Sequence, residues 1–156
     1  MCMKNVNAIV NIEALDESNN IITYDEESGA KTIPIIDGKA RLVISFYYSI
    51  INGQDDFFAK HQALQFQIRI LDKGKNNIGT LKDCFVDLNK FNNKSYYNAG
   101  FVDFISDKSE EVVSLDLNNI EPNSTYILCV LVRDKKAVDE GEAWIIQSVS
   151  QLNFKK

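Results

Sequence analysis

Apolar and polar residues alternate with a period of two along most of the chain, which is the spacing of β-strands that bury one face. In ALQFQIRIL (63–71) one face is wholly apolar and consists of Leu64, Phe66, Ile68 and Ile70. The segment 40–51 repeats the pattern, with an apolar face made of Leu42, Ile44, Phe46, Tyr48 and Ile50. Further strands are predicted over 6–14, 100–105, 111–117, 125–134 and 142–154. The chain is therefore predicted to be mostly β.

Turn-forming residues separate these strands. Asn52-Gly53 and the run from Lys73 to Asn77 contain residue types that accept a positive φ, and EPNS (121–124) interrupts the chain before the strand 125–134. No helical pattern between the strands is long enough for the crossovers that parallel sheets need. The pattern therefore predicts an antiparallel sandwich of two sheets.

Two segments depart from the alternation, and each is compatible with a short helix. They are DDFFAKHQ (55–62) and TLKDCFVDLNKF (80–91). In the second segment one helical stripe collects Leu81, Phe85, Leu88 and Phe91, and Thr80 with Asp83 resembles a capping box. A strand that alternates through Cys84 and Val86 fits the same residues equally well. We favour the helix for 80–91.

The stretch IEPNSTY (120–126) carries a family resemblance. With the strands 42–49, 64–70, 113–132 and the last strand from about 142, it resembles strands B, C, E, F and G of a fibronectin type III or related immunoglobulin-like domain. In that family a leucine and a proline precede a threonine and a tyrosine that open strand F; here these places hold Ile120, Pro122, Thr125 and Tyr126. The resemblance implies that the Tyr126 hydroxyl returns to backbone near the preceding turn.

The chain also departs from this family. Phe46 occupies the place of a common strand-B tryptophan, and the segment 72–110 is much longer than the usual connection between strands C and E. We therefore expect one domain, residues 1–156, with an insertion over about 72–110 that holds a short helix. The resemblance covers about two thirds of the chain and assigns no catalytic residue.

The net charge and the length of the apolar segments limit the kinds of partner that the protein is expected to bind. The net charge is −5, whereas nucleic acids and anionic membranes require a basic face. No stretch approaches the ~20 apolar residues of a membrane span, and the beginning of the sequence lacks the apolar core of a secretory signal. The expected location is the cytoplasm, with a leader removed on maturation left open. We expect no nucleic-acid or membrane partner; a homo-oligomer is compatible with the sequence.

Candidate chemistry is sparse. An enzyme would need the single histidine, His61, as base and Cys84 as nucleophile, with Asp55 or Asp56 as the orienting acid. No nucleophile elbow, phosphate loop or zinc motif supports that assignment. The acidic clusters lack the spacing of a calcium loop, so we expect no metal site and no cofactor. Cys129 is out of phase with the core face of its strand, which Tyr126 and Leu128 share, and is expected to be a reduced, inert residue.

The most suggestive surface is KFNNKSYYNAGF (90–101). Phe91, Tyr96 and Tyr97 are interspersed with small polar residues, a composition typical of binding loops, although tyrosines that only cover the core edge are an equal alternative. Tyr47, with Val43, is expected to add an apolar patch on the outer side of its strand. We therefore predict a non-enzymatic module that binds a partner protein through a sheet face or the 72–110 insertion. The alternatives are a carbohydrate-binding module and an unrecognised thiol or acid/base enzyme.

Overall fold

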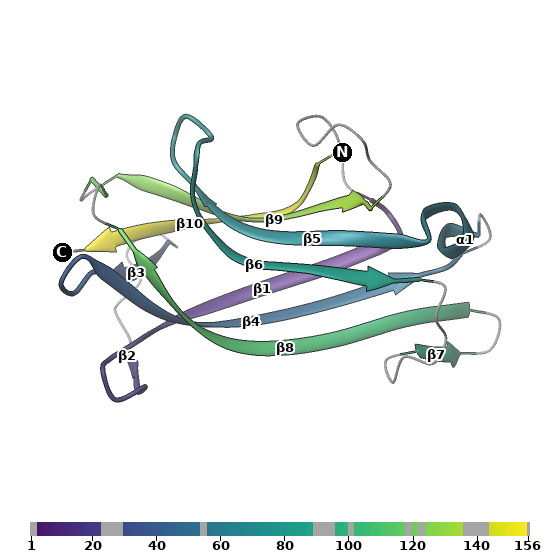
Figure 1. Cartoon of the computed structure of the whole chain (residues 1–156), viewed down its shortest axis with the longest axis horizontal. Coiled ribbons are helices and arrows are strands. Elements are labelled where there is room, and N and C mark those ends of the chain that lie inside the picture. The colour runs from purple at the N-terminus through teal and green to yellow at the C-terminus, as the bar shows by residue number, and fades with distance from the viewer. Residues whose placement is uncertain are drawn as a thin grey trace.

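The computed structural model describes residues 3–22, 30–53, 56–88, 96–99, 102–117, 120–121, 124–135 and 144–155, with the backbone alone for 96–99 and 102. This part of the chain is mostly β-strand, which confirms the predicted class (Figure 1). Its one helix, α1 (Phe57–His61), has five residues. It lies within the segment 55–62 for which a short helix was predicted.

The first sheet is antiparallel throughout, with the order β2-β1-β4-β8-β7. Its strands are β1 (Val6–Leu15), β2 (Ile21–Ile22), β4 (Lys39–Ile51), β7 (Tyr96–Ala99) and β8 (Val102–Asp116). β8 is one continuous strand where the sequence predicted two. Because β4 lies between β1 and β8, its 13 residues form the centre of this sheet.

The second sheet has the order β3-β10-β9-β5-β6. Its strands are β3 (Lys31–Pro34), β5 (Ala63–Leu71), β6 (Asn77–Asp87), β9 (Thr125–Asp134) and β10 (Ile145–Lys155). All neighbouring strands are antiparallel except β3 and β10, which are parallel. The strands of both curled sheets extend along the length of the molecule (Figure 1).

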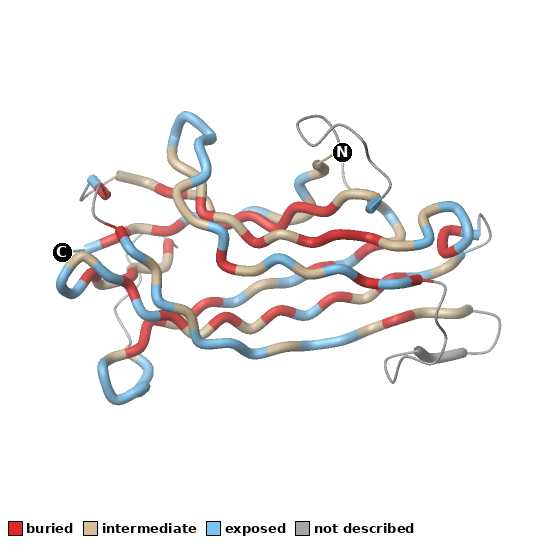
Figure 2. The backbone as a smooth tube through the Cα atoms, viewed as in Figure 1, coloured by how far each residue is buried: buried red, intermediate tan, exposed pale blue. Residues whose placement is uncertain are grey.

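The two inner faces share one hydrophobic core. Every residue of the two apolar faces predicted for 40–51 and 63–71 is buried, and buried positions alternate along these strands (Figure 2). The aromatic rings of Phe46 and Tyr48 from the first sheet lie 5.5 and 5.3 Å from the ring of Phe66 in the second. Contacts between these three rings therefore join the sheets near the middle of the core.

The predicted helix over 80–91 is wrong, because residues 77–87 form the edge strand β6 in register with β5. A helix would have buried Phe85 beside Leu81; in the strand Leu81 is buried whereas Phe85 is 59% exposed. The backbone hydrogen bonds to β5 outweigh the local helical pattern. Residues 89–91 lie outside the described part of the chain.

The segment 72–110 contributes strands to both sheets. β6 extends the second sheet beyond β5, and β7 with the first half of β8 belongs to the first sheet. The Lys82 ammonium and the Glu111 carboxylate form a salt bridge that links β6 to β8. The described residues of this segment are therefore integral to the two sheets.

The tyrosine contact expected at the start of β9 is present. The backbone N–H of Glu121 donates a hydrogen bond to the Tyr126 hydroxyl over 3.2 Å. The Tyr126 ring is buried and meets the ring of Phe154 edge-on, with 5.2 Å between ring centroids. The turn before β9 is thereby tied to the core.

Tyr126→Phe is expected to reduce the free energy of unfolding by about 1 kcal/mol, because the Glu121 N–H loses its acceptor while the ring keeps its packing. Urea unfolding of the variant and the wild type measures the difference. Tyr47→Phe is the matched control, since its hydroxyl lies on a surface strand. Equal stabilities of Tyr126→Phe and the wild type would show that the contact does not stabilise the turn.

Candidate functional site

The outer face of the second sheet carries a network of polar side chains. The Asp83 carboxylate accepts hydrogen bonds from the amide nitrogens of Gln65 and Gln67 at 2.9 and 3.0 Å. The amide oxygens of the same two glutamines accept bonds from Nε of Arg133 and Nε of Arg69, each 2.7 Å long. The network spans β6, β5 and β9 and holds these five side chains in place.

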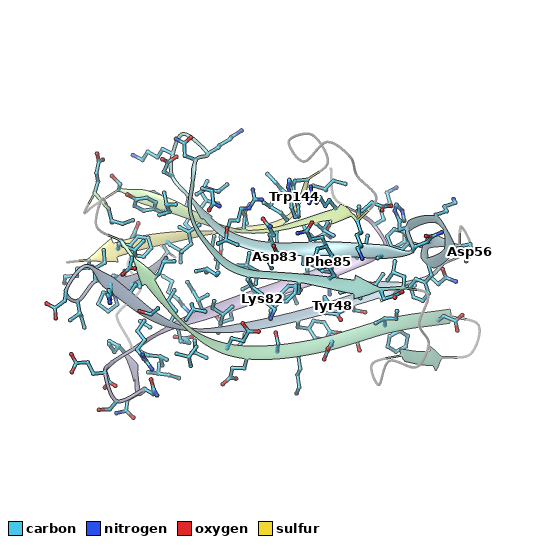
Figure 3. The ribbon with its side chains drawn as sticks, in the orientation of Figure 1. Tyr48, Asp56, Lys82, Asp83, Phe85 and Trp144 are labelled. Atoms are coloured by element: carbon cyan, nitrogen blue, oxygen red, sulfur yellow. The ribbon has the colours of Figure 1, made fainter. Side chains whose placement is uncertain are left out.

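Trp144 lies against the arginines of this network (Figure 3). The guanidinium carbons of Arg133 and Arg69 lie 4.4 and 5.0 Å from the centre of its ring, within the range of cation–π attraction. Cys129 and Leu131 point outward from β9, as the sequence phase predicts, yet both are buried. These side chains cover the part of this outer face over β5 and β9, whereas Phe85 on β6 and Ile146 and Val149 on β10 remain exposed.

The outer face of the first sheet lacks such a cover. Its central strands β1, β4 and β8 expose Ile9 (55%), Tyr47 (39%), Ile51 (44%) and Val112 (51%). They alternate along β1, β4 and β8 with small polar residues. Ile9 and Tyr47 pair side by side and form a small apolar area bordered by polar groups, a kind of surface that occurs at binding sites for other macromolecules.

A hollow of about 440 Å³ lies in the middle of this outer face. Strand register builds its wall from two neighbouring rows of residues that cross β1, β4 and β8. The first row is Ile9, Tyr47 and Lys108, and the second is Asn11, Ser45 and Glu110. The short side chain of Ser45 beside the long one of Tyr47 leaves the depression.

The predicted binding residues are not all brought together. Tyr47 lines the hollow, as expected from its outward phase. Tyr96 and Tyr97 belong to the edge strand β7, where their backbones pair with Ile105 and Phe104, so this pair lies in a strand and not in the predicted loop. The side chains of Tyr96 and Tyr97, and Phe91 as a whole, lie outside the described residues.

The sequence prediction missed Ile9, Ser45, Lys108 and Glu110 as parts of one site. Ile9 and Ser45 are visible as outward positions of their predicted strands. Their alignment with Lys108 and Glu110 depends on the pairing of β4 with β8, whose sequences are about 60 residues apart. No local pattern reports that pairing.

The two described residues considered for thiol chemistry, Cys84 and His61, do not interact with each other. Burial raises the pKa of the Cys84 thiol, although Lys82 partly opposes this effect. Because the thiolate is the nucleophilic form, Cys84 is not activated at neutral pH. Nδ1 of His61 lies 2.9 Å from a carboxylate oxygen of Asp134, and the His61 ring packs 4.2 Å from that of Phe57. The structure thus pairs His61 with an acid but gives Cys84 no activating base among the described residues.

A larger hollow of about 540 Å³ lies at one end of the sheets, beside the β5–β6 turn and the start of β9. Its walls include Asp72, Asp116 and Glu121, with Ile78 and Leu117 as apolar members. Within the described ranges, no three or more His, Cys, Asp or Glu residues are grouped to hold a metal ion. The described chain also contains no helix long and apolar enough to cross a membrane.

The sequence matches no protein-family model and no curated protein.

Proposed function

We propose that this protein is a non-enzymatic module that binds a partner protein through the outer face of the first sheet. The observation that carries the proposal is the hollow beside Tyr47, together with the exposure of Ile9 on the same row. Its volume of about 440 Å³ is comparable to the ~300–1,000 Å³ of ligand pockets, and the hollow opens onto the surface of the sheet. The hollow accommodates an apolar or aromatic side chain of the partner.

The chemistry of the rim supports a protein partner. Tyrosine is enriched among the residues that dominate protein–protein binding energy, because its ring adds apolar area at a small entropic cost. Lys108 and Glu110 place one charge of each sign at the edge of the hollow. Charges at the rim fix the orientation of a partner more than they add affinity.

The strand arrangement supports an immunoglobulin-like or fibronectin type III-like sandwich as the architecture that presents this face. β4 and β8 occupy one sheet as strands B and E do in such domains, and β5, β9 and β10 occupy the other as C, F and G do. The hydrogen bond between Glu121 and the Tyr126 hydroxyl adds the corner contact of that class. Binding modules are common among such sandwiches, but the site and not the fold carries the functional proposal.

Tyr47→Ala is expected to weaken partner binding at least about tenfold, since a buried aromatic anchor typically contributes more than ~1.4 kcal/mol. A partner captured by the wild type is purified and titrated by calorimetry against each variant. Phe85→Ala is the matched control, because Phe85 is an exposed aromatic residue on the other sheet. Unchanged affinity of Tyr47→Ala, or a loss confined to Phe85→Ala, would place binding elsewhere.

A further inference from the structure

We infer that the partner bound by the outer face of the first sheet is a second copy of this chain. The inference rests on the proposed function and specifies its occupant. Two identical faces that pack on each other are related by a two-fold axis lying in the interface. The two rows that line the hollow determine where this axis passes.

The axis crosses the strands between the two rows, at the level of Phe46 and Ser109. Rotation about such an axis turns the strand direction around, so that each row of one copy faces the other row of the second copy. Strand β4 then lies over β4 of the second copy, and β8 lies over β8. This arrangement predicts three kinds of contact between the copies, and the two-fold axis makes each of them occur twice in the dimer.

The first contact is electrostatic. Lys108 and Glu110 point outward from β8 two residues apart, and both are exposed. Within the described part of the chain, neither side chain has a hydrogen-bond or salt-bridge partner. The axis places Lys108 of each copy opposite Glu110 of the other, which makes the face complementary to itself in charge.

The second contact is steric. Tyr47 projects from β4 beside the small Ser45, which forms the depression in the hollow. Across the axis each Tyr47 lies over the Ser45 of the other copy and fills its hollow. Ile9 on β1 correspondingly lies over Asn11 of the second copy.

The same alternation continues in the adjoining rows. The row next to Ser45 and Glu110 contains Val43 and Val112. The row next to Tyr47 and Lys108, at the same distance from the axis on its other side, contains Ser49 and Ser106. The axis therefore sets each valine opposite a serine. Alternating large and small side chains allow two sheet faces to interdigitate at a separation of about 10 Å.

Two observations favour this face, among the described surfaces, as the one that meets a second copy. On the outer face of the second sheet, Trp144 with Arg69 and Arg133 covers the region over β5 and β9. On the long edge strand β6, Lys82 points inward and bonds Glu111, a device that opposes pairing with another edge. Ten residues of the three strands β1, β4 and β8 cover an area of only about 14 by 34 Å. Because a stable interface buries ~800 Å² per partner, we expect a reversible, micromolar dimer.

Charge reversal tests the arrangement without changing the core. Sedimentation velocity of the full chain over a range of concentrations gives the dimer dissociation constant for the wild type and for Lys108→Glu and Glu110→Lys. Each single variant sets like charges opposite each other and is expected to weaken the dimer by about tenfold or more.

An equimolar mixture of the two variants restores opposite charges at both contacts, so it is expected to form a heterodimer of wild-type affinity. The double variant Lys108→Glu/Glu110→Lys is expected to dimerise like the wild type. Lys73→Glu, an exposed charge reversal in the β5–β6 turn, is the control that leaves the dimer unchanged.

The outcomes separate this inference from the proposed function. A wild type that stays monomeric at every concentration overturns the inference, whereas the proposed function fails only if Tyr47→Ala leaves binding of an isolated partner unchanged. A dimer that the single variants do not weaken also overturns it, as does a mixture of the single variants that fails to recover the dimer.

Discussion

Replacing Phe66 with alanine is expected to lower the free energy of unfolding by about 3–5 kcal/mol, the range found for large aromatic truncations in packed cores. Phe66 is 1% exposed on the inner face of β5. Its ring contacts the rings of Phe46 and Tyr48 on the first sheet. The truncation therefore removes buried apolar area and leaves a cavity where the two sheets meet.

Urea unfolding followed by fluorescence or circular dichroism measures this loss. Phe85→Ala is the matched control: it makes the same chemical change on the neighbouring strand, but Phe85 is 59% exposed, so we expect a cost below about 1 kcal/mol. Phe66→Leu keeps most of the volume and is expected to cost about 1.5 kcal/mol, which provides a foldable variant. Equal costs for the two alanine variants would contradict the position of Phe66 in the core.

The long strands β1, β4, β5, β9 and β10 could be predicted from the sequence, because burial on one face produces a period of two in each of them. The predicted apolar faces of β4 and β5, with five and four residues, follow directly from this alternation, and all nine residues are buried. The local pattern failed for β6. Leu81 and Phe85 share a helical stripe, but β6 is held by pairing with β5. The register of that pair shifts twice, between Ile68 and Arg69 and between Ile70 and Leu71. Such an irregular edge strand breaks the alternation that identifies a strand.

Contacts between distant segments could not be predicted. The parallel pairing of β3 with β10 joins residues more than 100 positions apart, and β3 has only four residues, ending at Pro34. The phase of β9 correctly placed Cys129 outward, yet its burial depends on side chains from other strands. The Arg69 and Trp144 side chains pack against each other over the outer face of the second sheet, and only the tertiary structure brings them together.

For the candidate site too, the sequence predicts the outward residues of each strand but not the pairing between distant strands. The outward phase of β4 identifies Tyr47 as a surface residue and Ser45 as its small neighbour. The charges at the hollow come from β8, which pairs with β4 only in the folded chain. A single sequence therefore indicates which face of each strand is exposed, but strand register decides which exposed residues form one site.

Raising the pH from 10 to 12 is expected to cost the wild type about 1–2 kcal/mol of stability through Tyr48 alone, since one pKa unit corresponds to ~1.36 kcal/mol and partial solvent exposure reduces the effect. Burial raises the pKa of Tyr48 from 10.0 to about 12, and the Asp107 carboxylate and Cys84 add to this shift. Tyr48 and Lys82 lie between β6 and the first sheet, where the phenolate would be poorly solvated (Figure 3). The folded protein therefore holds the phenol proton more tightly than the unfolded chain does. The stabilisation is fully present below pH 10 and is lost as the pH approaches 12.

Tyr48→Phe isolates this effect, because phenylalanine keeps the ring that packs 5.3 Å from Phe66 and removes the ionisable hydroxyl. Burial also raises the pKa values of the Cys84 and Cys129 thiols, so both proteins lose stability at high pH in the same direction. The difference between their unfolding free energies, measured in urea at pH 8, 10, 11 and 12, should therefore grow above pH 10 in favour of the variant. Parallel curves across this range would mean that Tyr48 ionises as freely in the folded protein as in the unfolded chain. That result would contradict its burial between the sheets.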